Sequence, residues 1–315
     1  MNKKKIVKLG LQIVIYLVVG LFMYFAVRDK VSDLKDYSIS NFWLLLLSVP
    51  LFSLNVAINS WTWHTMMDFS GEKIPFMESM NVYVSSFIVR YIPGNVWAII
   101  ARAVMNKKFG VNMMKTAWGW LIENITFLMV GMLFSLFVLA SVYKERPEVL
   151  IVVLIALPVC IVFLLRYELI GKLFNFLVKK KFKKYYDKNV EMLELSFRHK
   201  LTLVGMYGLS WLAYSLHYFV VVNAVTGVGI DKFFLITGIN ALAWSVGYMS
   251  IITPSGGGVR EGIMILALTT LGIMGEVDAV VVTLIARLAF IAGELLYFAF
   301  TKLVYFLWNR NGKSK

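Results

Sequence analysis

Several charged side chains fall inside apolar stretches of the sequence, where they could bind a charged group at membrane depth. They are four arginines and three glutamates: Arg90, Arg102, Arg260, Arg287, Glu123, Glu261 and Glu294. A charge at that depth costs roughly 2.5 to 3.5 kcal/mol on insertion scales, so each one needs a partner or a wet cavity. The set has one more cation than anion, and the planar guanidinium of arginine can hold phosphate through two hydrogen bonds. These residues therefore favour an anionic, phosphate-bearing ligand, with the four arginines as its binding residues and Glu261 orienting Arg260 and Arg287.

The same charges have two other interpretations. In the first, they pair with one another as packing ion pairs, because buried pairs alone are weak evidence of function. Arg287 and Glu294, for example, are seven residues apart and would project from one face of a helix. In the second, Glu123 or Glu261 is the general base of an integral membrane transferase. The residue types leave all three interpretations open.

Two apolar stretches, 76–105 and 233–274, are interrupted by residues that break helices. The interrupting residues are Pro93, Gly94 and Asn95, followed by Trp97, in the first stretch, and Pro254, Ser255, Gly256, Gly257 and Gly258 in the second. Proline removes a helix donor and glycine costs about 1 kcal/mol in a helix interior, which predicts two short helices around a non-helical joint in each stretch. A helix that starts at such a joint points free N–H groups inward, which suits an anion. A plainer interpretation is that proline and glycine are common in membrane helices.

The elements that must position these residues are membrane-spanning helices. Of the 315 residues, 59% are hydrophobic and 16% charged, whereas a soluble domain has roughly 45 to 50% and 25%. Six uninterrupted apolar runs are long enough to cross about 30 Å of hydrocarbon. They cover residues 9–27, 42–63, 116–142, 149–165, 201–225 and 277–308. The sequence predicts an all-α polytopic membrane protein with one integral membrane domain, 1–315.

The composition also excludes several classes of protein. The net charge of +14 does not indicate nucleic acid, because lysine and arginine cluster in short segments between apolar runs, as they do in membrane proteins. The single cysteine, Cys160, excludes an internal disulfide. No set of His, Cys, Asp and Glu has metal-ligand spacing, so neither a metal nor a cofactor is expected.

The positive charges also predict the orientation of the chain. If each interrupted stretch enters and leaves by one face, as a re-entrant hairpin, most Lys and Arg outside the spans are cytoplasmic, whereas single crossings would make most of them external. The hairpin arrangement is favoured, with both termini cytoplasmic. It makes units 42–142 and 201–308 an inverted repeat, as in many secondary transporters. The basic segment 166–200 is then cytoplasmic, either as an amphipathic segment on the leaflet or as a solvated loop.

The residues around the two joints resemble those of a known membrane family. The matching residues are Arg90, Pro93, Gly94, Trp97 and Arg102, then Leu121 and Glu123, then 254–258 with Arg260, Glu261 and Gly262, and finally Arg287. In order and spacing they resemble the flippase-like integral membrane domain of lysylphosphatidylglycerol synthases, over about residues 6–308. That family often has Glu-Arg and then Asp after the first hairpin, where this sequence has Asn124 and Thr126. The resemblance therefore gives no support for an ion pair peculiar to that helix.

The resemblance implies a lipid flippase or transporter. Family members that synthesise aminoacylated lipids carry a cytosolic transferase domain after the membrane part, and this sequence ends at Lys315; we therefore expect no enzyme. The leading hypothesis is movement of an anionic or phosphate-bearing lipid, either an aminoacylated phospholipid or a polyprenyl-phosphate-linked sugar, between leaflets of the cell membrane. The alternatives are an integral membrane transferase and a non-transporting partner of a lipid-synthesising enzyme. Membrane lipids are the expected partners.

Overall fold

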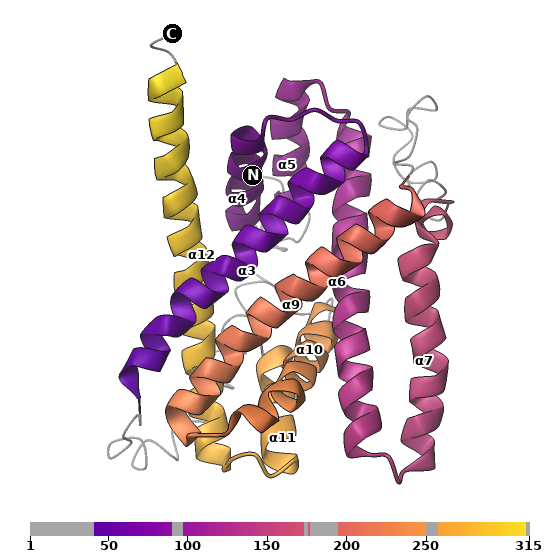
Figure 1. The fold of residues 1–315 in the computed structure, drawn as a ribbon, viewed down its shortest axis with the longest axis vertical. Coiled ribbons are helices and arrows are strands. Elements are labelled where there is room, and N and C mark those ends of the chain that lie inside the picture. Colours follow the sequence, from indigo (N-terminus) through magenta and orange to yellow (C-terminus); the bar gives the residue numbers. More distant parts are fainter. Residues whose placement is uncertain (1–40, 90–96, 173–175, 177–194, 250–257, 313–315) are drawn as a thin grey trace, which may run out of the picture.

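The structure is a computed structural model that describes residues 41–89, 97–172, 176, 195–249 and 258–312 (Figure 1). Every regular element within these residues is a helix. Several predictions fall outside the described residues. They concern the first span at 9–27, Arg90, the joint residues Pro93, Gly94, Asn95 and 254–257, and most of the basic segment 166–200.

Among the described residues, five helices are long and apolar enough to cross a membrane. They are α3 (Phe42–Phe69), α6 (Met113–Val142), α7 (Pro147–Leu165), α9 (Phe197–Thr226) and α12 (Glu276–Gly312). Side chains cap some of their first turns. Oδ1 of Asn41 accepts a hydrogen bond from the Trp43 N–H at 3.1 Å, and Oγ of Ser196 accepts one from the His199 N–H at 3.2 Å. Such caps satisfy N–H groups that have no partner within the helix.

Each of the two interrupted stretches forms two short helices. The first gives α4 (Phe76–Ile88) and α5 (Trp97–Asn106), and the second gives α10 (Phe233–Met249) and α11 (Val259–Thr270). A 3-10 turn follows α5 (η2, Lys107–Phe109) and another precedes α10 (η4, Ile230–Lys232). With 10 to 17 residues, the four short helices fall below the roughly 20 that a spanning helix needs. The described helices of each pair lie on either side of the proline- and glycine-containing residues that predicted the interruption.

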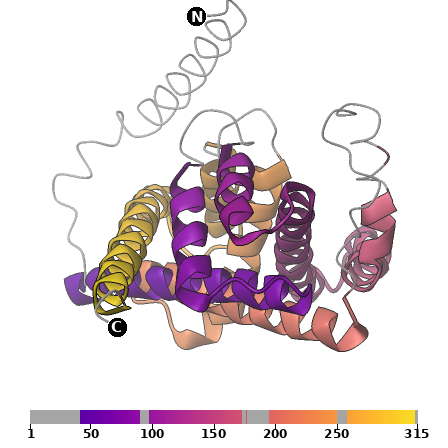
Figure 2. The same cartoon turned by 90° about the horizontal axis from the view of Figure 1, so that it is seen from above.

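The long helices form one bundle, with a pair of short helices at each end (Figure 1). α3 and α9 run antiparallel and side by side, diagonally between α12 and α6 (Figure 1), and they lie along one face of the bundle when it is seen from above (Figure 2). α4 and α5 lie at the end where α3 finishes and α6 starts. α10 and α11 lie at the opposite end, where α9 finishes and α12 starts. Seen from above, α7 stands at the outer edge of the bundle, beyond α6 (Figure 2).

The neighbours of each helix correspond between the two halves of the chain. α4 packs against α5 and α12, just as α10 packs against α11 and α6. α5 packs against α6 as α11 packs against α12, and α3 packs against α4 and α12 as α9 packs against α10 and α6. α3 and α9 also pack against each other. Each of these contacts made by helices α3 to α6 therefore has a counterpart among helices α9 to α12.

Small and polar side chains allow α3, α6 and α9 to pack closely. Nδ2 of Asn55 on α3 donates to both O and Oγ of Ser210 on α9, each at 2.8 Å, and Oγ of Ser210 donates to Oδ1 of Asn59 at 2.8 Å. On α6, Gly131 leaves room for Trp211 of α9, since a Cβ there would lie 2.4 Å from the indole ring. Small residues and interhelical hydrogen bonds are typical of contacts between membrane helices. They fix the crossing of α3, α6 and α9.

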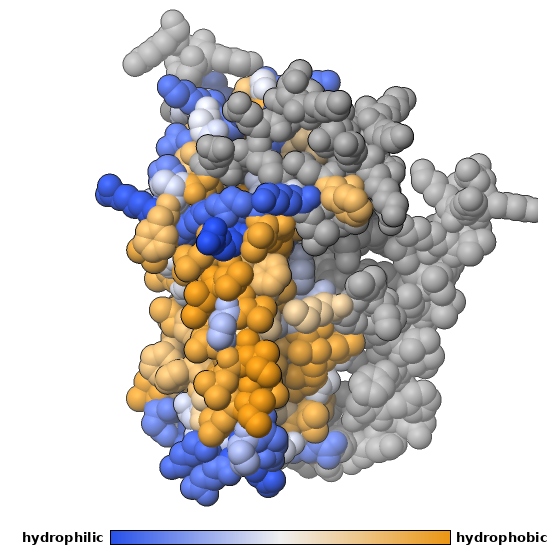
Figure 3. Space-filling model, turned by 90° about the vertical axis from the view of Figure 1, so that its right-hand side faces the viewer, coloured by the Kyte–Doolittle hydropathy of each residue, from blue (hydrophilic) through white to orange (hydrophobic). Residues whose placement is uncertain are grey.

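The surface of α7 is almost entirely apolar. Its exposed large apolar side chains are Ile151, Val152, Leu154, Ile155, Leu157, Val159, Ile161, Val162, Phe163 and Leu165. On this side of the molecule an apolar belt lies between two polar ends (Figure 3). Soluble proteins rarely expose so continuous an apolar face, whereas hydrocarbon accommodates it. The belt is the surface that a multi-pass membrane protein presents to lipid.

The chain that follows α7 is tied to the start of α9. Nζ of Lys200 donates to the Leu165 carbonyl at 3.0 Å and also pairs with Glu168. The hydrogen bond from Lys200 to the Glu168 carboxyl lowers the pKa of that carboxyl. The hydroxyl of Tyr167 shares a hydrogen bond of 2.7 Å with Thr126 on α6. Burial raises the pKa of Tyr167 to about 12. These contacts fasten the start of the basic segment to the bundle.

Candidate functional site

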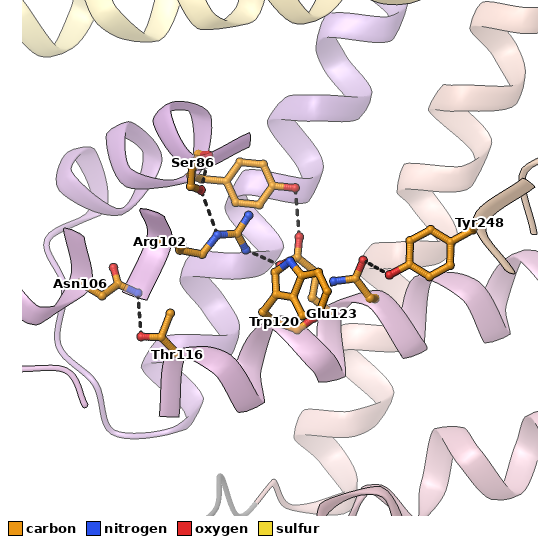
Figure 4. A network of polar contacts seen from close by, with 9 residues as sticks. Ser86, Arg102, Asn106, Thr116, Trp120, Glu123 and Tyr248 are labelled. Carbon is orange, nitrogen blue, oxygen red and sulfur yellow. Dashed lines mark hydrogen bonds and ion pairs between the residues drawn. The ribbon is translucent and has the colours of Figure 1, made fainter. Parts of the chain in front are cut away.

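Arg102 on α5 and Glu123 on α6 form a buried ion pair (Figure 4). Nη1 of Arg102 donates to Oε2 of Glu123, and Nε of Arg102 donates to Oγ of Ser86 at 3.0 Å. The hydroxyl of Tyr83 donates to Oε1 of Glu123 at 3.1 Å. The guanidinium also lies 4.3 Å from the ring centroid of Trp63 and 4.5 Å from that of Tyr83. Only 2% of Arg102 is exposed. We call these five residues the α5–α6 cluster.

The turn between α5 and α6 brings this ion pair together. Gly110 ends η2 with a φ of 81°, a conformation that side-chain-bearing residues rarely adopt. Across the turn, Nδ2 of buried Asn106 donates to Oγ1 of Thr116 at 3.2 Å (Figure 4). This reversal of the chain places Arg102 and Glu123 face to face although they lie on different helices. α3 and α4 add the aromatic rings that cover them.

A second cluster joins α11 to α12. Oε2 of Glu261 accepts a hydrogen bond from the N–H of Gly258, the N-cap residue of α11, at 2.7 Å. Oε1 of Glu261 lies 3.7 Å from Nη1 of Arg287, and 22% of the Arg287 side chain is exposed. This ion pair is therefore looser and more open than the pair of the α5–α6 cluster.

Arg260, next to Glu261, faces aromatic rings. Its guanidinium lies 5.4 Å from the ring centroid of Tyr214 and 5.3 Å from that of Phe290, and Arg287 lies 5.1 Å from the same Phe290 ring. Arg260 is only 8% exposed. Within the described part of the chain it makes no hydrogen bond and no ion pair. We call Arg260, Glu261, Arg287, Tyr214 and Phe290 the α11–α12 cluster; its described charges comprise two cations and one anion.

A series of aromatic rings connects the two clusters. The ring centroid of Tyr214 is 5.6 Å from that of Trp211, which is 5.6 Å from that of Trp244. Trp244 stacks on Tyr248 at 4.9 Å, and the Tyr248 hydroxyl donates to Oδ1 of Asn124 at 2.8 Å (Figure 4). Asn124 directly follows the glutamate of the α5–α6 cluster in the sequence. Contacts between side chains therefore extend from the α11–α12 cluster to the residue next to Glu123.

The model of the lysylphosphatidylglycerol synthase transmembrane region matches residues 9–293 of the chain. The chain belongs to this family. The match includes both pairs of short helices and every residue of the two clusters. A comparison with curated proteins finds no match.

Five charged residues of the family motifs fall into these two clusters. Arg102 and Glu123 meet in one cluster, and Arg260, Glu261 and Arg287 meet in the other. Glu261 contacts Arg287 rather than Arg260. Glu261 was expected to orient both Arg260 and Arg287, and it directly contacts Arg287 alone.

Three further candidate residues have different positions. Trp97 begins α5 and has an exposed ring, and Gly258 is the N-cap of α11. Glu294 is buried on α12, two helical turns beyond Arg287. Asn124, which stands where the family often has a charged residue, donates from Nδ2 to the Trp120 carbonyl at 2.7 Å and accepts from Tyr248.

Sequence reasoning missed the aromatic and hydroxyl groups of the site: Trp63, Tyr83, Ser86, Tyr214, Phe290 and Tyr248. Aromatic residues make up 15% of the sequence, so their type singles out none of them. Within the described residues, no group of three or more His, Cys, Asp or Glu side chains could hold a metal ion. The arrangement is instead suited to binding an anion, through arginines that rest on aromatic rings.

Proposed function

We propose that this protein moves a lipid with an anionic, phosphate-bearing headgroup between the two leaflets of the cell membrane. One observation carries the proposal. Arg260 is a buried cation that has no carboxylate or hydrogen-bond partner among the described residues. A cation at membrane depth is costly without a counter-charge, and the phosphate of a lipid would supply one. Arg287, which is partly exposed and loosely paired, would add a second planar set of donors.

The proposed substrate class is defined by this shared chemistry. An aminoacylated phospholipid and a polyprenyl-phosphate-linked sugar both carry a phosphate on a long apolar chain. The family description supports a lipid substrate because it refers to a lysylphosphatidylglycerol synthase. The outward apolar surface of helices such as α7 would let the lipid chains stay in hydrocarbon while the headgroup contacts the arginines.

The proposal includes an architecture for transport. Six spans would enclose two re-entrant hairpins, α4–α5 and α10–α11, which enter from opposite faces, and both termini would be cytoplasmic. Units 42–142 and 201–308 would be inverted copies. The placement of the hairpins at opposite ends of the bundle and the corresponding helix neighbours support this arrangement (Figure 1). In transporters of this type the substrate binds at broken helices near the midplane.

Reconstitution tests the proposal. The protein is placed in vesicles that contain fluorescent phosphatidylglycerol, and a membrane-impermeant reductant destroys the outer-leaflet signal; movement of lipid makes the protected fraction accessible. Arg260→Lys keeps the charge but loses the bidentate geometry, so transport should fall clearly, and Arg260→Ala should abolish it. The matched control is Arg146→Ala, which removes an exposed arginine in the loop before α7.

The expected stability separates a binding role from a packing role. Arg260→Ala removes a cation that has no paired carboxylate among the described residues, so the folded yield should remain close to that of the natural protein. Lack of lipid movement by the folded natural protein, with fluorescent phosphatidylglycerol and with a polyprenyl phosphate, would exclude transport of this class. Formation of a new lipid product without transbilayer movement would indicate the transferase instead.

A further inference from the structure

The two ion pairs occupy corresponding places in the two halves of the chain, but the acid and the base have exchanged helices. In each half, the pair joins the second short helix to the long helix that follows it: α5 to α6, and α11 to α12. The arginine is on the short helix in the first pair (Arg102) and on the long helix in the second (Arg287). Glu123 is residue 11 of α6 and Arg287 is residue 12 of α12, counted from their starts. The two pairs are therefore counterparts at similar depths.

The two counterparts are in different states. Arg102 and Glu123 are in direct hydrogen-bond contact, with side chains only 3% and 12% exposed. Glu261 and Arg287 are 3.7 Å apart. The other oxygen of Glu261 is already engaged by the Gly258 N–H. One pair is closed, and its counterpart is loosened.

Arg102 is enclosed in a way that leaves little access for a headgroup. Its guanidinium donates to Glu123 and Ser86 and lies over the rings of Trp63 and Tyr83. A phosphate could reach it only by displacing the carboxylate of Glu123. The arginines of the α11–α12 cluster are not enclosed by hydrogen bonds in this way. The asymmetry favours headgroup binding at the second cluster and a holding role for the first.

We propose that Arg102–Glu123 and Glu261–Arg287 are latches, ion pairs that hold a short helix against the next long helix and close alternately. The inference rests on the proposed lipid transport. In the state described, the α5–α6 latch is closed and the α11–α12 latch is loosened, so the headgroup enters at the α11–α12 end and replaces Glu261 on Arg287. Closure of that end opens the other latch and releases the lipid there. Arg102 and Glu123 are therefore positioning residues and not headgroup ligands.

Helix α10 provides a physical connection between the latches. The Tyr248 hydroxyl at its end bonds to Asn124, the residue after Glu123. Gly247, the neighbour of Tyr248 on α10, packs so closely on α11 that a Cβ there would lie 2.9 Å from Cβ of Arg260. A displacement of α10 therefore acts on α6 and α11 together. Packed side chains and hydrogen bonds of this kind can carry coupling between distant sites.

Paired cysteine labelling in lipid nanodiscs, where both faces of the membrane are open to reagent, tests the alternation without measuring lipid movement. In a Cys160→Ser background, Ala98→Cys reports on α5, one helical turn from Arg102 on the same face. Gly262→Cys reports on α11, where an added Cβ meets nothing within 4 Å. Glu123→Asp weakens the first latch while keeping its charge. Labelling by a water-soluble maleimide should accelerate at Ala98→Cys and slow at Gly262→Cys, each by about fivefold or more, as expected for coupled sites.

The reciprocal change distinguishes a latch from a packing pair. Faster labelling at Ala98→Cys alone, with an unchanged rate at Gly262→Cys, overturns the proposal, as does no change at either site. The matched control is Glu72→Asp, which shortens the acid of the ion pair between Glu72 and Lys115 at the α3–α4 connection. It should leave both labelling rates unchanged.

Charge reversal tests whether Arg102 binds the headgroup. Arg102→Glu combined with Glu123→Arg preserves the attraction between the two side chains. Compared with Arg102→Glu alone, the combination should restore the natural labelling rates at Ala98→Cys and Gly262→Cys, and it should restore lipid movement. If the combined variant folds and has the natural labelling rates but moves no lipid, Arg102 is a headgroup ligand, and its assignment as a positioning residue is overturned. Compared with Glu261→Arg alone, Glu261→Arg combined with Arg287→Glu should restore the natural labelling rates but not lipid movement. If the natural protein moves no lipid but Glu123→Asp still changes the two labelling rates in opposite directions, the latches are retained and lipid transport is refuted. Failure of the latch proposal and failure of the transport proposal can therefore be distinguished.

Discussion

Replacement of Glu123 by glutamine should destabilise the protein far more than the same replacement of Glu261. Glutamine keeps the shape of the side chain and removes its charge, so Glu123→Gln leaves Arg102 buried without a counter-ion. Removing one partner of a buried pair costs about 3 to 5 kcal/mol. Glu261→Gln should cost at most about 1 kcal/mol, since its amide oxygen can still accept from Gly258 and the contact with partly exposed Arg287 resembles a surface pair.

Equilibrium unfolding in mixed detergent micelles, followed by tryptophan fluorescence, measures this difference. A loss of about 3 to 5 kcal/mol lowers the folding equilibrium constant roughly a hundredfold to several thousandfold. The control is Arg102→Met combined with Glu123→Gln, which removes both charges and should recover most of the stability. The reasoning from burial is refuted if Glu261→Gln destabilises as much as Glu123→Gln, or if the double variant is less stable than Glu123→Gln.

Two further predictions concern the scaffold. Gly131→Leu should sharply lower the folded yield measured by size-exclusion chromatography, because a Cβ at Gly131 would lie 2.4 Å from the Trp211 ring and overpacking costs about 1 to 3 kcal/mol. The control is Gly208→Ala, where a Cβ meets nothing within 4 Å, and it should have little effect. A normal yield for Gly131→Leu would contradict the close contact. Because Lys200 lowers the pKa of Glu168, their interaction stabilises the fold above the unfolded pKa and is lost as pH falls through the folded value. The stability difference between the natural protein and Glu168→Gln should be a few tenths of a kcal/mol at neutral pH, since Glu168 is 59% exposed. It should shrink as the pH falls below the unfolded value of about 4.3, and a difference that grows in acid would refute the assignment.

The helices could be predicted from the sequence because their signals are local. A run of apolar residues long enough to cross hydrocarbon needs no knowledge of its neighbours, and five of the six predicted runs correspond to long helices in the described residues. The interruption of 76–105 and 233–274 into pairs of short helices follows from proline and glycine in the same way. The ends were less well predicted. α3 continues to Phe69, past the predicted end at residue 63, because its last turns bury Met66 and Met67 in the core.

The sequence identified the charged residues of the site but not their partners. It placed Arg287 and Glu294 on one face of a helix, which follows from helical periodicity alone. It did not predict that Arg102 and Glu123 close on each other from separate helices, or that Glu261 contacts Arg287 while Arg260 rests on Tyr214 and Phe290. These pairings depend on how deeply each helix is set and where it crosses its neighbours.

The sequence alone thus determined the membrane class, the helix breaks and the family motifs, because chain length, apolarity and backbone chemistry act over a few neighbouring residues. The tertiary structure decided which arginine is enclosed and which lacks an acidic partner among the described residues. Helices approach closely where a side chain is missing, as α10 approaches α11 at Gly247, whose added Cβ would lie 2.9 Å from Cβ of Arg260. Such a contact sets the distances between charges on different helices, and a linear sequence contains no direct measure of those distances.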